Sequence, residues 1–336
     1  MTSQAFNMAR EVDIYNGVPF SNRNFITDGN FDFWQLGSAT LPAATLSNTT
    51  ATMFYEYSGA GGATTVSSSS WNGAEPVAMA TPANNYLTFQ QTTASTGTVA
   101  ASTAPYVQHR IESTKSLAGR SATFSCWLWC SSGTQTITNL LVRQNFGTGG
   151  SPSTSVIVDT AVNWTITTTP TRFSARVDLP SVAGKTVGTN GNDYLAIGIW
   201  FPPGATYTIG TAQWQLEQCS PNAPATGLPT AFEYRCRQAE YARVCRYYET
   251  GVEPFKYISG LTGVTGAYDT VPFLVHKRAA PTMTLTGWKY YAGGTDTVFT
   301  PTNVYGGYDG FTFQGLSLTN WCGWDGAGTW VADARL

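Results

Sequence analysis

Short runs of β-branched and aromatic residues, separated by turn-forming dipeptides, constrain the fold of this chain more than any other feature. Asn-Gly or Asp-Gly pairs recur along the sequence and favour tight turns, and no comparable run carries helical periodicity. The pattern predicts an all-β chain, an antiparallel sandwich or jelly roll. The clearest runs are ATFSCWLW (122–129), VIVD (156–159), RFSARVDL (172–179), YLAIGIWF (194–201) and YTIGTAQWQLE (207–217).

Two low-complexity segments interrupt this pattern near the N-terminus. They are TLSNTTATM (45–53) and GAGGATTVSSSSWNG (59–73), and both offer little apolar surface to bury. We expect them to form long surface loops between strands.

One segment, AFEYRCRQAEYARVCRYYETG (231–251), predicts a helix. It has no Gly or Pro between Arg235 and Tyr248, and four residues with helical spacing form one stripe. The preceding SPNAPATGLPTAFE (220–233) contains three prolines and predicts an extended strap. Either the helix packs its stripe on a neighbouring sheet, or it sits at a junction between domains or subunits. The stripe consists of Tyr241, Val244, Cys245 and Tyr248.

Composition limits the partners of the chain. At 336 residues the chain is long enough for two domains, only 11% of its residues are charged, and its net charge is -2. This balance gives no electrostatic reason to expect nucleic acid, and no stretch approaches the ~20 apolar residues of a membrane span. The N-terminus lacks the charged head and apolar run of a secretory signal, so we expect no export by that route.

Cysteine and histidine usage argues against zinc. Six cysteines form no C-x-x-C pair, and the two histidines, His109 and His276, are far apart in sequence. Cys126 and Cys130 are four residues apart on a predicted strand, which separates their Cα atoms by about 13 Å and places them beyond disulfide reach. We expect reduced, buried thiols.

Several longer motifs, in this order, carry a resemblance to a known family. They are FITDGNFDFWQLG, SLAGRSATFSCWLW, LPSVAGKTVG, DYLAIGIWFPPGATYTIGTAQWQLEQC, TAFEYRCRQAEYARVCRYYETG and VHKRAAPTMTL. Together, over roughly residues 24–336, they resemble bacteriophage tail-fibre and appendage proteins with a carbohydrate-binding-module-like jelly roll.

The resemblance implies an organisation. An attachment segment (1–23) would bind other virion proteins, a jelly roll (24–234) would follow, and a connecting helix (235–250) would lead to a small C-terminal β domain (251–336). It further implies a virion protein made in the bacterial host cytoplasm, assembled as a homotrimer and in contact with the host surface.

Calcium is common in binding modules related to this family. Asp28 and Asp32, near the first strand, are the candidate ligands. The alternative is that both are turn-forming carboxylates. No other cofactor is expected.

Catalytic motifs are weak in this sequence. GKT at 184–186 has Leu179 where a phosphate-binding loop needs its first glycine, and there is no G-x-S-x-G elbow. A glycosidase needs only two suitably spaced carboxylates, and several acids fall on predicted strands. We expect no enzymatic activity, with polysaccharide depolymerase as an alternative.

The surplus of tryptophan supplies the candidate glycan-binding residues. Alternation along ATFSCWLWC places Phe124, Cys126, Leu128 and Cys130 on one face and Trp127 and Trp129 on the other. Near the C-terminus, Trp321, Trp324 and Trp330 lie among glycines with Asn320 and Asp325. These rings either stack on sugars or form a hydrophobic plug.

The sequence therefore predicts a phage fibre or appendage subunit that binds a host-surface glycan without catalysis. The alternative is a purely structural capsid decoration, head fibre or tail adaptor.

Overall fold

The structure is a computed structural model, and it describes residues 23–48, 50–80, 83–252, 256–258, 268–292, 295–298, 302–314, 322–324 and 328–336. The chain divides into two compact units between Arg237 and Gln238. No helix within these ranges is long and apolar enough to cross a membrane.

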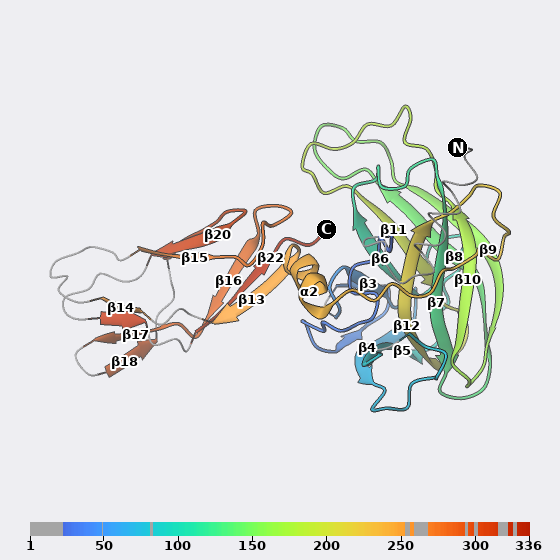
Figure 1. Ribbon diagram of the computed structural model, residues 1–336, viewed down its shortest axis with the longest axis horizontal. Helices are drawn as coiled ribbons and strands as arrows, with labels where there is room; N and C mark the ends of the chain where they lie inside the picture. Colours follow the sequence, from blue (N-terminus) through green and yellow to red (C-terminus); the bar gives the residue numbers. More distant parts are fainter. Residues whose placement is uncertain are drawn as a thin grey trace, which may run out of the picture. The chain divides into compact units, whose positions relative to one another are not determined.

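The first unit is a β-sandwich of two antiparallel six-stranded sheets, as expected (Figure 1). In sheet I the strand order is β1 (Ala39–Leu41), β4 (Ala63–Ser70), β5 (Asn85–Thr93), β12 (Tyr207–Gln218), β7 (Ser121–Cys130) and β10 (Thr171–Asp178). In sheet II it is β2 (Leu46–Ser47), β3 (Phe54–Tyr57), β6 (Tyr106–Glu112), β11 (Tyr194–Trp200), β8 (Gln135–Asn145) and β9 (Val156–Ile166).

Strand β4 corrects the expectation that residues 59–73 form a loop. Its serines and threonines pair with β5 on one side, and its first residues pair with β1 on the other. The central Val66 is fully buried in the core. Backbone pairing and one inward apolar residue are therefore enough to make a strand from a sequence with little to bury.

The sandwich core is built from alternating residues of both sheets. On β7, Phe124, Cys126, Leu128 and Cys130 point inward, which confirms the predicted alternation. Trp214 of β12 packs edge-on against Phe54 and Phe124, with ring centroids 5.4 and 5.1 Å apart. These contacts tie β12 to β3 of the opposite sheet, so the two layers share one core.

The helix α2 (Arg237–Cys245) is shorter than predicted. Tyr248 belongs to strand β13 (Tyr248–Val252), where it pairs with Asp333. Val244, Cys245 and Tyr248 are buried within the chain, and Tyr241 is half-buried. Burial and the neighbouring Cys245 thiol raise the pKa of Tyr241 to about 12. Most of the predicted stripe is therefore used inside one chain.

The described residues of the second unit form three small antiparallel sheets. In the first, β22 (Thr329–Asp333) lies between β13 and β16 (Thr282–Thr286). The second has the order β14 (Lys256–Ile258), β21 (Cys322–Trp324), β17 (Lys289–Ala292) and β18 (Thr295–Val298). The third has β15 (Tyr268–Pro272), β20 (Gly310–Gln314) and β19 (Thr302–Gly306).

Candidate functional site

The outward side of sheet I is covered, which corrects the expectation for Trp127 and Trp129. Trp71, Met79 and Ala83, from the connection between β4 and β5, pack with Trp127, which is only 7% exposed. Trp129 is half-buried, and its ring centroid lies 4.7 Å from that of Trp71. Both indoles therefore serve a small second core instead of offering a free stacking plane.

Residues 219–236, which follow β12 and include the predicted strap, cover a further part of this side next to β10. As predicted from its prolines, the strap contains no helix. The backbone N–H of Arg176 donates to Ala225 O (2.9 Å), and Arg172 Nη2 donates to Thr230 O (2.7 Å). The outward side of sheet II groups aromatic rings with guanidinium groups, and this chemistry makes it the candidate binding surface.

The outward side of sheet II is lined by aromatic rings and long polar side chains, a set we call the polar-aromatic face. Register places Gln108 of β6 opposite Tyr55 of β3 and Gly198 of β11. Because successive residues alternate between faces, the side chains two positions away point outward as well. The face comprises Tyr55, Tyr57, Tyr106, Gln108, Arg110, Arg143, Tyr194 and Trp200.

Three rings gather at one end of this face. Tyr57 and Tyr106 are stacked with centroids 5.2 Å apart, and Trp200 meets Tyr106 edge-on at 5.0 Å. Tyr106 and Trp200 are buried, whereas Tyr57 is only half-buried. Tyr57 is therefore the ring that a ligand would meet first, and the other two hold it in place.

Two guanidinium groups lie over rings of the same face. Arg110 lies 3.5 Å from the ring centroid of Tyr55 and 4.3 Å from that of Tyr194. Arg143 lies 5.5 Å from the centroid of Tyr106. Burial raises the pKa of Tyr106 and Arg143 partly offsets this, so the phenol stays neutral. These cation–π contacts fix the orientation of donors that can reach hydroxyl or carboxylate oxygens.

Gln108 lies at the centre of the polar-aromatic face and is fully buried. Among the described residues, neither the nitrogen nor the oxygen of its amide has a hydrogen-bond partner. A side chain at Gly198 would press on Gln108, since an added Cβ would stand 2.9 Å from the Gln108 Cβ. Buried polar groups are nearly always hydrogen-bonded, so this amide needs a water or ligand partner.

The C-terminal candidates are placed differently. Trp330 is 5% exposed, packs with Phe273 and Phe311, and donates from Nε1 to Val252 O at 3.0 Å. It belongs to the hydrophobic plug, which corrects its assignment to a glycan site. Trp324 contributes its backbone to β21, but its side chain, like all of Trp321, Asn320 and Asp325, lies outside the described residues.

The two candidate calcium ligands form a turn. Asp28 has φ of 54°, and its carboxylate accepts the backbone N–H of Asp32 (2.8 Å) and of Phe33 (3.2 Å). The Asp32 carboxylate accepts amide N–H groups of Asn30 and Asn84. Within the described part of the chain, no three His, Cys, Asp or Glu side chains form a metal-binding group. Both carboxylates thus accept hydrogen bonds within or next to one turn, the role that the turn-forming alternative gives them.

Sequence reasoning missed the polar-aromatic face. The signal was present in YVQHRIE (106–112), where Tyr106, Gln108 and Arg110 alternate with apolar or core residues. That alternation marks an outward polar and aromatic row, but the strands that extend the row come from distant parts of the sequence.

No known family model matches the chain. No curated protein matches it either. Many solved structures are similar to part of it, among them the following three. A putative sugar binding protein from Bacteroides thetaiotaomicron covers 58% of this chain and 100% of its own length, with 12% identity and a TM-score of 0.38.

The CBM22-2 xylan-binding domain from Paenibacillus barcinonensis Xyn10C covers 59% of this chain and 98% of its own, with 13% identity and a TM-score of 0.31. The enzymatically active domain of tailspike protein 4 from bacteriophage CBA120 covers 59% of this chain, which matches 22% of that protein, with 11% identity and a TM-score of 0.33. At such low scores these likenesses carry no information about the ligand of this chain.

Proposed function

We propose that this chain binds a carbohydrate through the polar-aromatic face, without catalysis, as a subunit of a phage fibre or appendage. The observation that carries the proposal is the buried amide of Gln108, which has no partner among the described residues. A glutamine amide offers both a donor and an acceptor, which suits the paired hydroxyls of a sugar. The half-buried Tyr57 supplies a ring for the apolar face of a pyranose.

The positions of the acids support binding without hydrolysis. Glu112 and Asp159 both lie on sheet II, on β6 and β9, and these strands are separated by β11 and β8. The Asp159 carboxylate accepts the indole N–H of Trp200 at 2.7 Å, which is a structural role. Asp178 and Asp193 serve structural hydrogen bonds from Ser121 and Thr114.

The virion role rests on the resemblance of the motifs between residues 24 and 336. It includes assembly as a homotrimer and attachment through residues 1–23. Multi-angle light scattering of the full chain tests the assembly, and the expected result is three chains per particle. A monomer at micromolar concentration contradicts it.

Binding is tested by a glycan array with the full chain, followed by titration calorimetry with the best ligand. Gln108→Leu keeps the size of the side chain and removes the amide. We expect it to weaken binding at least about tenfold, equivalent to about 1.4 kcal/mol. The melting temperature should stay equal or rise, because the variant removes a buried group without a partner.

Gln90→Leu is the matched control, since Gln90 is exposed on β5 of the other sheet. It should bind as the wild type does. Unchanged binding by Gln108→Leu would show that the amide is not part of a ligand site. Release of reducing ends from the bound polysaccharide would show that the chain is a depolymerase.

A further inference from the structure

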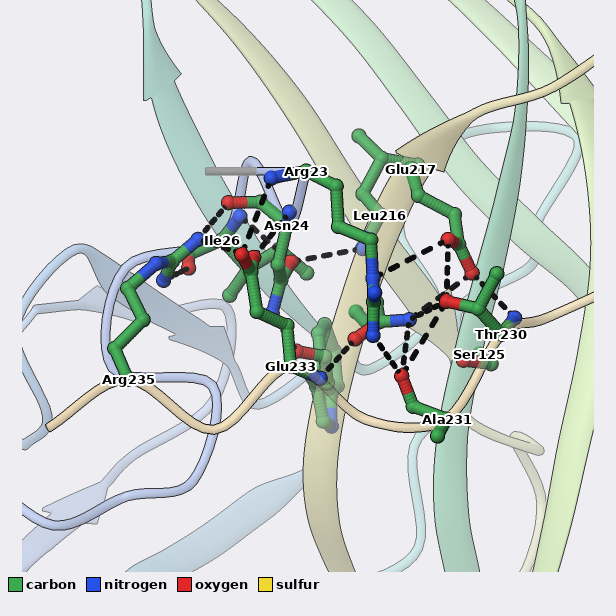
Figure 2. Close-up of polar contacts among 12 residues, drawn as sticks. Arg23, Asn24, Ile26, Ser125, Leu216, Glu217, Thr230, Ala231, Glu233 and Arg235 are labelled. Carbon is green, nitrogen blue, oxygen red and sulfur yellow. Dashed lines mark hydrogen bonds and ion pairs between the residues drawn. The ribbon is translucent and has the colours of Figure 1, made fainter. Parts of the chain in front are cut away.

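The chain enters and leaves the sandwich at one carboxylate, that of Glu233 (Figure 2). On the entry side, the backbone N–H of Asn24 donates to Glu233 Oε2 at 2.7 Å, and that of Arg23 donates to Oε1 at 3.4 Å. Asn24 and Glu233 are 209 positions apart in the sequence. A single buried side chain thus bridges the two ends of the domain.

The segment that leaves the sandwich also contacts the segment that enters it. Arg235 forms an ion pair with Glu233 at 3.1 Å, and its guanidinium donates to the carbonyl oxygens of Ile26 (3.2 Å) and Asn24. The side chains of Glu233 and Arg235 are 4% and 8% exposed. Charge-assisted hydrogen bonds in such a buried site are stronger than in water.

Both segments, the entry arm (residues 23–26) and the strap, are also hydrogen-bonded to the sandwich itself. The entry arm pairs with β12, where Phe25 N donates to Leu216 O (2.9 Å) and Leu216 N donates to Asn24 Oδ1 (3.0 Å). The strap is held through Glu217, whose carboxylate accepts the Thr230 N–H (2.8 Å) and hydroxyl (2.7 Å). Figure 2 shows Arg23 next to both carboxylates, and its Nη2 donates to Ala231 O at 2.5 Å.

We infer that these contacts form a mechanical latch that resists tension, defined as Arg23, Asn24, Glu233 and Arg235. Tension applied between the two ends of the chain reaches Asn24 from one side and Glu233 from the other. The bonds between these residues transmit this tension directly from one end of the domain to the other. The sandwich core between them is therefore not stretched. The latch does not depend on which ligand the chain binds, and it would protect any surface on the sandwich while the protein is pulled.

The test is single-molecule force spectroscopy of the full chain, with handles before residue 1 and after residue 336. Unfolding of the sandwich lengthens the chain by about 70 nm and that of the second unit by about 30 nm, so the two events are distinguishable. We expect Glu233→Ala to shift the ~70 nm event to lower force, and Glu233→Gln, which retains an acceptor oxygen, to shift it less.

The matched control is Asp193→Asn. The Asp193 carboxylate also accepts a backbone N–H and a hydroxyl from one residue, Thr114, but it lies off the path between the chain ends. This variant should keep the wild-type rupture force even where its melting temperature falls as far as that of Glu233→Gln. Equal force shifts for Asp193→Asn and Glu233→Gln, or an unchanged force in Glu233→Ala, would overturn the inference.

Discussion

The indole N–H of Trp200 donates a 2.7 Å hydrogen bond to Oδ1 of Asp159. Trp200 is on β11 and Asp159 is on β9, so the bond spans the intervening strand β8. Only 1% of Trp200 is exposed, which leaves its N–H dependent on this one carboxylate. The pair fixes the ring that supports Tyr106 and, through it, Tyr57.

We therefore expect Asp159→Ala to lower the free energy of unfolding by about 1 to 3 kcal/mol, the cost of a buried donor without a partner. Asp159→Asn keeps an acceptor oxygen at the same place and should lose less. Urea denaturation followed by tryptophan fluorescence measures both. Equal losses in the two variants would mean that the charge, and not the hydrogen bond, matters.

Trp330→Ala should destabilise the second unit by about 3 to 5 kcal/mol, because it removes a buried indole from the core. Tyr305, 64% exposed, gives the control Tyr305→Ala, which should change stability by less than about 0.5 kcal/mol. Calorimetric scans resolve the transition. If the Trp330→Ala variant is as stable as the wild type but binds the glycan less tightly, Trp330 belongs to the ligand site and not to the core.

Alkaline pH should weaken the sandwich. Burial raises the pKa of Cys126 and Tyr207 above their ordinary values of 9.0 and 10.0, so both stay protonated in the folded state where the unfolded chain ionises. The contribution of Cys126 is fully present below pH 9 and that of Tyr207 below pH 10, and above these values each is lost by about 1.4 kcal/mol per pH unit.

Chemical denaturation at several pH values between 8 and 10.5 measures this slope. Cys126→Ala should be less stable at neutral pH but should show a shallower slope above pH 9. The exposed Cys236 provides the control Cys236→Ala, with the wild-type slope expected. A slope unaffected by Cys126→Ala contradicts the assignment.

We expect strong energetic coupling between the fully buried Lys277 and Glu249. Its ammonium group donates to the Glu249 carboxylate and to Cys245 O (2.5 Å), and burial lowers its pKa. Lys277→Met alone leaves Glu249, 6% exposed, without its counter-charge and should cost about 3 to 5 kcal/mol.

The double variant Lys277→Met with Glu249→Leu should cost clearly less than the sum of the two single variants. A double-mutant cycle by urea denaturation gives the coupling directly. Additive losses would show that the ion pair contributes nothing beyond packing.

Local patterns in the sequence predicted the strands better than the surfaces. Alternation along Ser121–Cys130 correctly divided inward from outward residues, because it depends only on the period of two. It left open what covers Trp127, because the cover, Trp71, comes from a connection more than fifty residues away. A short sequence window contains no information about such contacts.

The helix shows how pairing overrides periodicity. Tyr248 has the spacing of a helical stripe, yet it begins β13 because the backbone of Asp333 is available as a partner. The polar-aromatic face has the same origin, since Tyr55, Gln108 and Gly198 become neighbours only through strand register. Neither result follows from propensity, because both depend on pairing between segments far apart in the chain.

The position of β22 has a consequence for biosynthesis. This strand, Thr329–Asp333, lies between β13 and β16, so the middle strand of the sheet is synthesised after both of its neighbours. Until β22 has left the ribosome, β13 and β16 have exposed edges that can pair with other nascent chains. A premature stop codon before residue 329 would therefore leave a complete sandwich attached to an aggregation-prone remnant, and this sheet of the second unit can close only after β22 has emerged from the ribosome.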